Sequence, residues 1–407
     1  MKIPPLPAIL FSCLLSLFAA AGETQAAEPA GKTLTGIDVL VRDGFRQLRG
    51  RRLGLITNHT GLDGRGKSTV SRLYESSAVD LLALFSPEHG LHGRLDVPLI
   101  GDSEDEGTGL RVYSLYGETR QPTAEMLAGI DTLVFDIQDI GSRFYTYIST
   151  LGLAMQAAAE HGLRFVVLDR PNPINGAAVA GPVTDPGRES FTAFHKIPVR
   201  HGMTVGELAL MFRHELDIEL DVEVIRAEGW SRSQYFDRTG LRWVNPSPNM
   251  RSLAQALLYP GIGLLETTNL SVGRGTDTPF EVIGAPWLDG DAFALELNRL
   301  GLPGVAFIPL RFTPDASKFE GEACGGVNIL VTERPVFDPV RTGLEIASTL
   351  RKHYPEAWDI DSYDRLLVHQ ATLDAVRAGR PYTEIKTGYR EGLEDFVIRR
   401  RAFLLYD

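Results

Sequence analysis

The segment from Leu81 to Gly93, LLALFSPEHGLHG, places a carboxylate and imidazoles directly after an apolar run. The run is typical of a buried strand, so Glu88 and His89 stand where the chain leaves the predicted sheet. Pro87 restricts the backbone before Glu88, and Gly90 lets the chain turn away. A carboxyl group partly shielded from water suits donation of a proton to a leaving oxygen. Glu88 is therefore a candidate general acid, and the alternative is a glutamate that caps a turn.

Polar side chains also follow three other apolar runs. The first run ends in Asn58 and His59, another in Asp136, Gln138 and Asp139, and the last in Asn172. One such ending marks only the point where a strand meets water. Parallel strands, however, bring their carboxyl ends to one edge of a sheet, where α/β proteins bind ligands. The four endings together predict a polar crevice, in which Asp136 is the second catalytic candidate.

The elements that must position these residues are predicted to form a parallel sheet. The four runs, residues 53–57, 81–85, 132–135 and 165–168, are short, apolar and do not alternate with polar residues. Strands buried on both faces have this pattern. Between the last two runs, apolar residues at helical spacing run from Ile148 to Ala159 and stop before Gly162, which predicts a βαβ unit. Thr204 and Glu207 form a capping box that predicts another helix.

Two further clusters could bind a ligand. Residues 136–147 combine charge with aromatic rings, and within them Arg143 could pair with a carboxylate while Tyr145 offers a flat face and a hydroxyl. In the segment ETTNLSVGRGTDTPFE, Asn269 and Arg274 form a later polar cluster. For the tyrosine the alternative is core packing, and for Arg274 it is an interdomain salt bridge.

Metal and nucleotide chemistry are alternatives. His89 and His92 are three residues apart, and His59 with Asp136 could join them, but no strong ligand spacing appears, so no metal is expected. Residues Gly61–Ser68, GLDGRGKS, match the phosphate-loop pattern G-x-x-x-x-G-K-[ST]. Three residues separate this loop from the preceding strand, and an exported protein meets little nucleotide triphosphate, so a solvated surface turn is the favoured interpretation.

The chain ends and the composition limit the function further. Lys2, an apolar stretch and small residues near Ala26 predict a signal peptide over residues 1–26, hence an exported, periplasmic or secreted protein without a membrane span after cleavage. Lipidation at Cys13 is an alternative. Cleavage leaves Cys324 alone, which excludes an internal disulfide. The net charge of −11 argues against a nucleic-acid partner.

The length of 407 residues favours two domains. We expect a Rossmann-like, mostly parallel α/β domain over residues 31–250, because the loop WVNPSPNM ends there. A smaller α+β domain over residues 251–407 should follow, with a strand at 327–331 and a helix starting near Pro339.

The motifs resemble the NamZ-type exo-β-N-acetylmuramidases. The matching stretches are GLITNHTG, LFSPEHGLHG, VYSLYG, LVFDIQDIGSRFYTYISTL, VLDRPNPING, GPV, IPVRHGMTVGELA, PSPNM, YPGIGLLETTNLSVGRGTDTPFEVIGAPW and ACGGVNILVT. The resemblance implies a Rossmann-like domain followed by a smaller one. It also implies release of terminal, non-reducing N-acetylmuramic acid from peptidoglycan fragments, with the glutamate of SPEHG, Glu88, as the catalytic residue. We expect no cofactor.

The sequence therefore predicts an exported glycosidase whose partners are muramyl saccharides. One rival hypothesis is a non-catalytic binder of cell-wall fragments that uses the same crevice. The others are a nucleotide hydrolase that uses Gly61–Ser68 and a metalloamidase that cleaves the peptide stem. The order of the motifs along the chain favours the glycosidase.

Overall fold

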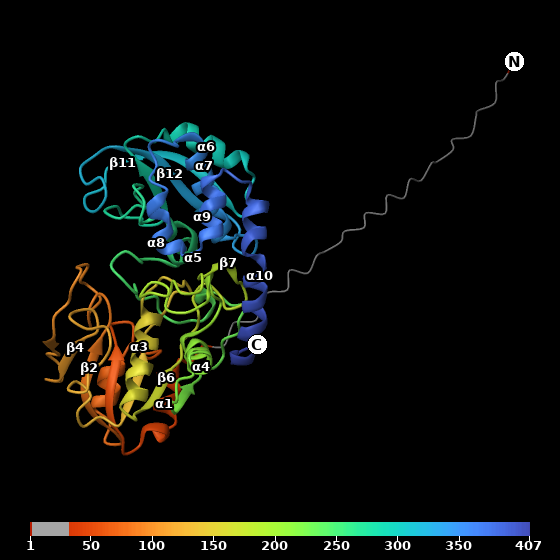
Figure 1. Cartoon of the computed structure of the whole chain (residues 1–407). Helices are drawn as coiled ribbons and strands as arrows, with labels where there is room; N and C mark the ends of the chain where they lie inside the picture. The colour runs from red at the N-terminus through yellow and green to blue at the C-terminus, as the bar shows by residue number, and fades with distance from the viewer. Residues whose placement is uncertain (2–31) are drawn as a thin grey trace.

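The computed structural model describes Met1 and residues 32–407. The predicted signal peptide and Cys13 lie outside the described residues, apart from Met1. The chain forms two lobes, one above the other in Figure 1. The lower lobe holds the parallel sheet, and the upper lobe holds a smaller sheet with its helices. Within residues 32–407, every helix is too short or too polar to span a bilayer.

A seven-stranded sheet forms the lower lobe, in the order β3-β4-β2-β1-β5-β6-β9. Six strands are parallel, and only β3 runs antiparallel to its neighbour β4. Their order, with β1 in the middle, is that of dinucleotide-binding Rossmann folds. The predicted fold class is confirmed. The strands are β1 (Arg52–Thr57), β2 (Asp80–Ser86), β3 (Ser103–Glu104), β4 (Arg111–Ser114), β5 (Thr132–Asp136), β6 (Arg164–Leu168) and β9 (Val222–Ile225).

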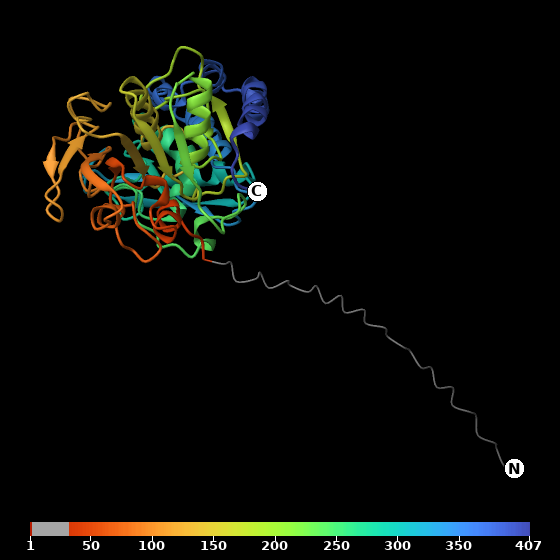
Figure 2. The same cartoon turned by 90° about the horizontal axis from the view of Figure 1, so that it is seen from below.

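Helices cover both faces of this sheet, which explains the unalternating strand sequences. In β5, Leu133 and Phe135 join the core under α3 (Tyr147–Glu160) and α4 (Val205–Glu215). Val134 joins the opposite core, which includes residues of α1 (Gly36–Arg42) and α2 (Thr69–Tyr74). Figure 2 shows the edge strands β3 and β4, in orange, projecting from the side of the body.

The predicted helix signals are confirmed. α3 ends at Glu160, and Gly162 just beyond it has a positive φ of 63°, a backbone conformation that glycine adopts without strain. The Thr204 side chain accepts a hydrogen bond from the Glu207 amide at the start of α4, and the Glu207 carboxylate accepts one from the Thr204 amide.

The upper lobe is built on a three-stranded antiparallel sheet in the order β10-β12-β11. The predicted strand at 327–331 is part of β12, and the helix predicted near Pro339 is α7. Cys324 is buried at the start of β12, and burial raises the pKa of its thiol to about 11. The elements are α5 (Leu253–Ile262), β10 (Val282–Ala285), α6 (Gly290–Arg299), β11 (Val305–Phe312), β12 (Cys324–Val331), α7 (Pro339–His353), α8 (Asp364–Leu367) and α9 (Gln370–Arg377).

The last helix, α10 (Tyr382–Arg400), runs along the side of both lobes (Figure 1). It packs on α9 and also on β7 (Ala180–Val183), which forms a small sheet with β8 (Pro198–Arg200). Beyond α10, the Tyr406 hydroxyl donates a 2.6 Å hydrogen bond to Asp169 at the end of β6. The C-terminal segment thus returns to the first lobe, a connection that a boundary at residue 250 does not describe.

One close helix contact can be tested. A methyl group on Gly343 of α7 would overlap the Gly261 carbonyl oxygen of α5. We expect Gly343→Ala to lower the free energy of unfolding in urea by about 1–3 kcal/mol, because the helices must separate. Gly388→Ala in α10 is the matched control, since no atom lies within 4 Å of its added methyl group. That control should gain about 0.4–1 kcal/mol, and a similar loss in both variants would contradict the packing argument.

Candidate active site

Glu88 lies just after β2 and next to the N-terminal end of helix α3. The hydroxyl of Thr146, the N-cap residue of α3, donates a hydrogen bond to Glu88 Oε2. The positive end of the helix dipole adds to this contact, since a helix N-terminus favours negative charge nearby. The Glu88 side chain is half-buried, so it is shielded from water without being closed off. This position suits a carboxyl group that meets a substrate.

Tyrosines surround Glu88 from several elements. Tyr116 follows β4, Tyr145 and Tyr147 lie at the start of α3, and Tyr259 comes from α5. Burial raises the pKa of all these phenols, and the nearby Glu88 carboxylate raises each of them further. The ring of Tyr145 packs edge-on against Tyr147 at 4.9 Å and against Tyr259 at 5.8 Å. The result is an aromatic enclosure beside Glu88 in which Tyr145, Tyr147 and Tyr259 are buried and Tyr116 is half-buried.

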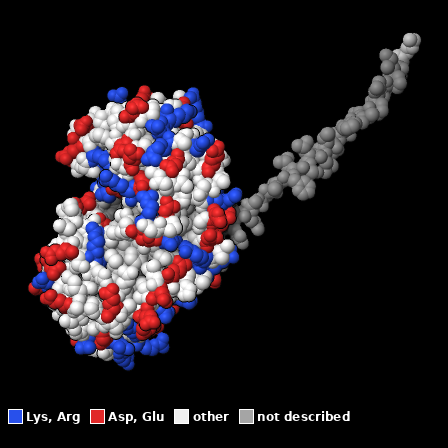
Figure 3. Space-filling model, viewed as in Figure 1, with Lys and Arg blue, Asp and Glu red and all other residues white. Residues whose placement is uncertain are grey.

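The enclosure lies where the lobes meet. Tyr259 of the upper lobe packs against Tyr145, and Arg274 of the same lobe reaches Asp96, which follows Glu88 in the chain, at 3.3 Å. Figure 3 shows the surface hollowed between the lobes on one side, with Lys and Arg side chains gathered around the hollow. Residues of both lobes therefore lie close to the segment that carries Glu88.

His89 and His92 lie near Glu88 in the chain, His59 follows β1, and the three side chains have different surroundings. His59 Nε2 is 2.6 Å from the Asn245 carbonyl oxygen, and burial, with the charges of His89, His92 and Arg94, lowers its pKa. The Nδ1 atom of His89 is 2.7 Å from the Leu95 carbonyl oxygen, whereas the His92 side chain is exposed. Among residues 32–407, no three His, Cys, Asp or Glu side chains are grouped to hold a metal ion.

Asp136 has a structural environment that corrects its proposed catalytic role. Its carboxylate is fully buried and accepts hydrogen bonds from Arg170 Nε at 2.5 Å and Arg170 Nη2 at 2.9 Å. The Thr69 hydroxyl donates a third bond at 2.5 Å. Both carboxylate oxygens are thus engaged inside the protein, so Asp136 holds the ends of β5 and β6 together instead of meeting a substrate.

Asp139 is close to the Glu88 enclosure and keeps one oxygen free. Its Oδ2 accepts a 2.7 Å hydrogen bond from the Gly141 amide and lies 3.5 Å from His201 Nε2. Its Oδ1 is buried with no hydrogen-bond partner among the described residues, and so is the Tyr145 hydroxyl. The charges of Asp139 and Glu88 both raise the pKa of Tyr145 after the larger effect of burial, so both carboxylates approach the same phenol.

Three of the other candidates are structural. Arg143 is fully buried and donates hydrogen bonds to the carbonyl oxygens of Pro182, Leu366 and Leu367, which leaves it no route to a substrate carboxylate. The Asn172 amide donates to the Met203 carbonyl oxygen, and Asn269 bonds to the backbone of residues 357 and 359. The sequence predicted that these three residues bind the substrate, but their side chains instead hold segments of the fold together.

Arg274, Asn58 and Gln138 remain at the edges of the site. Arg274 pairs with Glu266 and with Asp96, so it forms the interdomain salt bridge that was the alternative interpretation. Asn58 Oδ1 accepts from Thr60, while its Nδ2 is buried without a partner among the described residues. The Gln138 amide donates to the carbonyl oxygens of residues 139 and 171.

In the phosphate-loop-like segment, a side chain of the loop itself already binds the backbone amides. The Asp63 carboxylate accepts hydrogen bonds from the amides of Arg65 and Lys67 at 2.9 and 2.8 Å. A phosphate cradle needs such amides free. The Lys67 ammonium pairs with Glu75. This geometry disfavours nucleotide binding at Gly61–Ser68.

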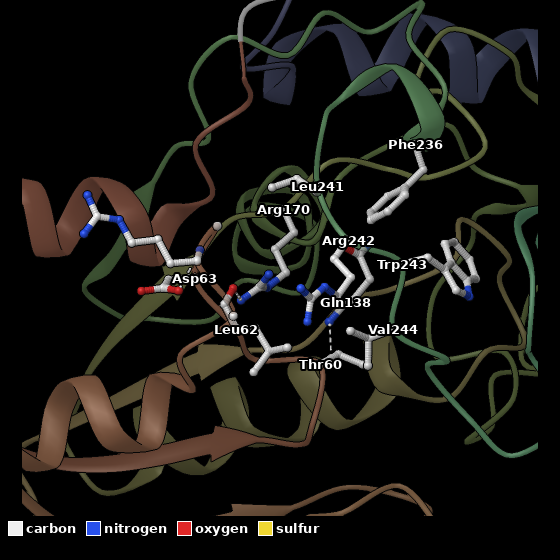
Figure 4. Close-up of a pocket in the computed structure, with 13 residues that line it drawn as sticks. Thr60, Leu62, Asp63, Gln138, Arg170, Phe236, Leu241, Arg242, Trp243 and Val244 are labelled. Atoms are coloured by element: carbon white, nitrogen blue, oxygen red, sulfur yellow. Dashed lines mark hydrogen bonds between the residues drawn. The ribbon is translucent and has the colours of Figure 1, made fainter.

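A separate cavity of about 90 Å³ lies between this loop and residues 236–244. Figure 4 shows Arg170 and Arg242 side chains converging there beside Gln138. The cavity lies at the end of β1 and β5, the usual ligand position of a Rossmann fold. Its only lining carboxylate is Asp63, which is already bonded to Arg72 and to the loop amides, so acid–base chemistry is better placed at Glu88.

The sequence reasoning missed Thr146, Tyr116 and Tyr259, all of which surround Glu88. Tyr116 follows β4, a strand of four residues that is too short for a clear apolar run. Tyr259 reaches the site from another lobe, which no local pattern indicates. Thr146 stood inside the polar–aromatic run, and its position before the helical stripe was the available signal of an N-cap.

Removal of the Asp136 charge tests its structural role. Asp136→Asn leaves Arg170 buried without its ion pair, and we expect a loss of about 3–5 kcal/mol in the free energy of unfolding. Asp131→Asn, in the more exposed pair with Arg52, is the control and should cost no more than about 1 kcal/mol. Urea denaturation of both variants gives the comparison, and equal losses would contradict the assignment.

Comparison with known proteins agrees with this architecture. Residues 53–254 match the family model "Exo-beta-N-acetylmuramidase NamZ, N-terminal", and residues 257–406 match its C-terminal counterpart. The peptidoglycan β-N-acetylmuramidase NamZ of Bacillus subtilis (strain 168) is 43% identical over 402 residues, 98% of this chain and 97% of that protein. Two DUF1343 family proteins of Bacteroides fragilis superpose with TM-scores of 0.87 and 0.76 at 37% and 29% identity; the matches cover 92% and 93% of this chain and 99% of each of those chains. The chain therefore belongs to the NamZ family of exo-β-N-acetylmuramidases.

Proposed function

We propose that this protein hydrolyses peptidoglycan fragments and releases terminal, non-reducing N-acetylmuramic acid, with Glu88 as the general acid. The observation that carries the proposal is the half-buried Glu88 carboxyl group among tyrosines of both lobes, in a member of this family. Tyr116 is the half-buried tyrosine of this group, and its hydroxyl can bond to a sugar oxygen. A carboxyl group within this enclosure can protonate the glycosidic oxygen as the bond breaks.

We place the second carboxylate at Asp139 instead of Asp136. Glycosidases that use two carboxylates need the second one to act as a base or nucleophile on the other side of the bond. The free Asp139 Oδ1 and its approach to Tyr145 support this choice, while the engaged oxygens of Asp136 oppose it. His201 beside Asp139 Oδ2 would help to fix the orientation of the group.

We also propose that the protein acts outside the cytoplasm. The charged start, apolar stretch and small residues before position 27 support export, and peptidoglycan fragments occur beyond the inner membrane. The nucleotide-hydrolase alternative loses support, because the Arg65 and Lys67 amides of the Gly61–Ser68 loop are already bonded to Asp63. A binder without activity would use the same enclosure, and a turnover assay separates it from an enzyme.

Glu88→Gln tests the general acid. The amide cannot supply the proton, so release of N-acetylmuramic acid from its β-linked disaccharide with N-acetylglucosamine should fall by about 10²–10⁴-fold. Chromatography of the released sugar measures the rate. Glu106→Gln, on an exposed glutamate of the same lobe, is the control and should keep full activity. Near-normal turnover by a folded Glu88→Gln variant would remove Glu88 from the role, and wild-type binding without product would favour the binder.

Asp139→Asn tests the second carboxylate. The amide oxygen can still accept the Gly141 hydrogen bond, so the turn should persist while the charge is lost. We expect kcat to fall by about 10²–10⁴-fold with a small change in KM. The thermal midpoint should move much less than in Asp136→Asn. A stable variant with wild-type kcat would exclude Asp139 from the chemistry.

A further inference from the structure

Arg120 presents an unpaired guanidinium group close to Glu88. It follows β4 and lies between two aromatic rings, with its guanidinium carbon 4.4 Å from the centre of the Tyr116 ring and 3.9 Å from that of Phe191. Its Nη1 is buried without a hydrogen-bond partner among the described residues. Within residues 32–407, Arg120 also has no carboxylate close enough for an ion pair. A partly buried cation is costly to leave unpaired, so this position indicates a missing anion.

Tyr116 and helix α3 position both Arg120 and Glu88. The Tyr116 hydroxyl lies beside both groups: burial and Glu88 raise its pKa, while Arg120 lowers it. On the other side, the Phe191 carbonyl oxygen accepts a 2.6 Å hydrogen bond from Ser149, one turn along α3 from the Thr146 that contacts Glu88. The Tyr116 and Phe191 ring centres are 5.9 Å apart. Helix α3 therefore fixes the acid and, through Phe191, one wall of the Arg120 site.

The chemistry of the site favours a carboxylate. Aromatic rings against a guanidinium restrain it while its N–H groups remain able to bond in the plane, and this planar fork fits the two oxygens of a carboxylate. The other arginines that the sequence suggested for this task are engaged: Arg143 bonds to backbone carbonyl oxygens and Arg274 pairs with Glu266 and Asp96. Arg120 is the arginine beside Glu88 that is ready for an anion.

We propose that Arg120 binds the lactyl carboxylate of the terminal muramic acid and thereby selects this sugar over N-acetylglucosamine. The inference rests on the proposed function, since it names the group of that substrate which is recognised. The lactyl ether is on O3, two ring carbons from the anomeric carbon whose bond breaks. A lactyl carboxylate bound at Arg120 would be separated from the general acid Glu88 by the Tyr116 side chain, and this separation fits the spacing within the sugar.

The test compares substrates that differ only in the carboxylate. Wild-type protein should hydrolyse a p-nitrophenyl β-N-acetylmuramide about 10- to 150-fold better, in kcat/KM, than its lactyl methyl ester, because a hydrogen-bonded ion pair is lost. Arg120→Gln should lose the same factor on the acid and almost nothing on the ester. Arg120→Lys, which keeps the charge without the fork, should fall between them. Arg111→Gln, on an exposed arginine of β4, is the control.

The outcomes separate the inference from the function. Equal wild-type rates on acid and ester would overturn the role of Arg120, and so would equal losses on both substrates in a folded Arg120→Gln variant. The first comparison needs no variant, so a failure of Arg120→Gln to fold leaves the test intact. If wild-type protein cleaves neither substrate, the proposed function fails. Calorimetry with free N-acetylmuramic acid and its methyl ester then decides: tighter binding of the acid, lost in Arg120→Gln, supports the inference, and equal binding overturns it.

Discussion

At the carboxyl edge of the parallel sheet, the buried Asp136 carboxylate joins β5 to Arg170, which follows β6, and to Thr69 at the start of α2. Arg170 Nη2 also donates to the Leu62 carbonyl oxygen of the loop after β1 at 2.9 Å. Three strand ends therefore depend on one largely buried ion pair, in which Asp136 has no exposed surface and Arg170 lines the neighbouring cavity. An ion pair of this kind fixes geometry more than it adds stability, because its desolvation offsets much of its attraction.

At this fixed edge of the sheet, the two acidic residues Asp136 and Glu88 have different roles. Asp136 holds the loops, and Glu88, on the next strand but one, stays free to meet a substrate. Helix α3 starts beside Glu88, which its N-cap Thr146 contacts directly. Tyr259 packs against Tyr145, and Arg274 pairs with Asp96, so residues of both lobes contribute to this region.

The sequence predicted the sheet well because strands buried on both faces carry an unbroken apolar signal, as in Leu133–Phe135. It also placed Glu88 at a strand end, where the turn residues around it are distinctive. It could not assign the partners of polar side chains. Arg143 has the sequence surroundings of a ligand-binding residue, yet two of its three partners, Leu366 and Leu367, are more than 200 residues away. The sequence did not predict Arg120 as a site residue, because its aromatic neighbours Tyr116 and Phe191 are brought together only by the fold.

The return of the C-terminal segment to the first lobe has a consequence for how the chain is made. Asp169 accepts from Tyr406, Glu207 accepts from the Leu405 amide, and Arg400 caps the carbonyl oxygens of Gly176 and Gly202. The first lobe thus lacks these contacts until residues 400–406 have been synthesised. Contacts so distant along the chain form slowly, so the part of the first lobe that these residues complete is the last part of it to form.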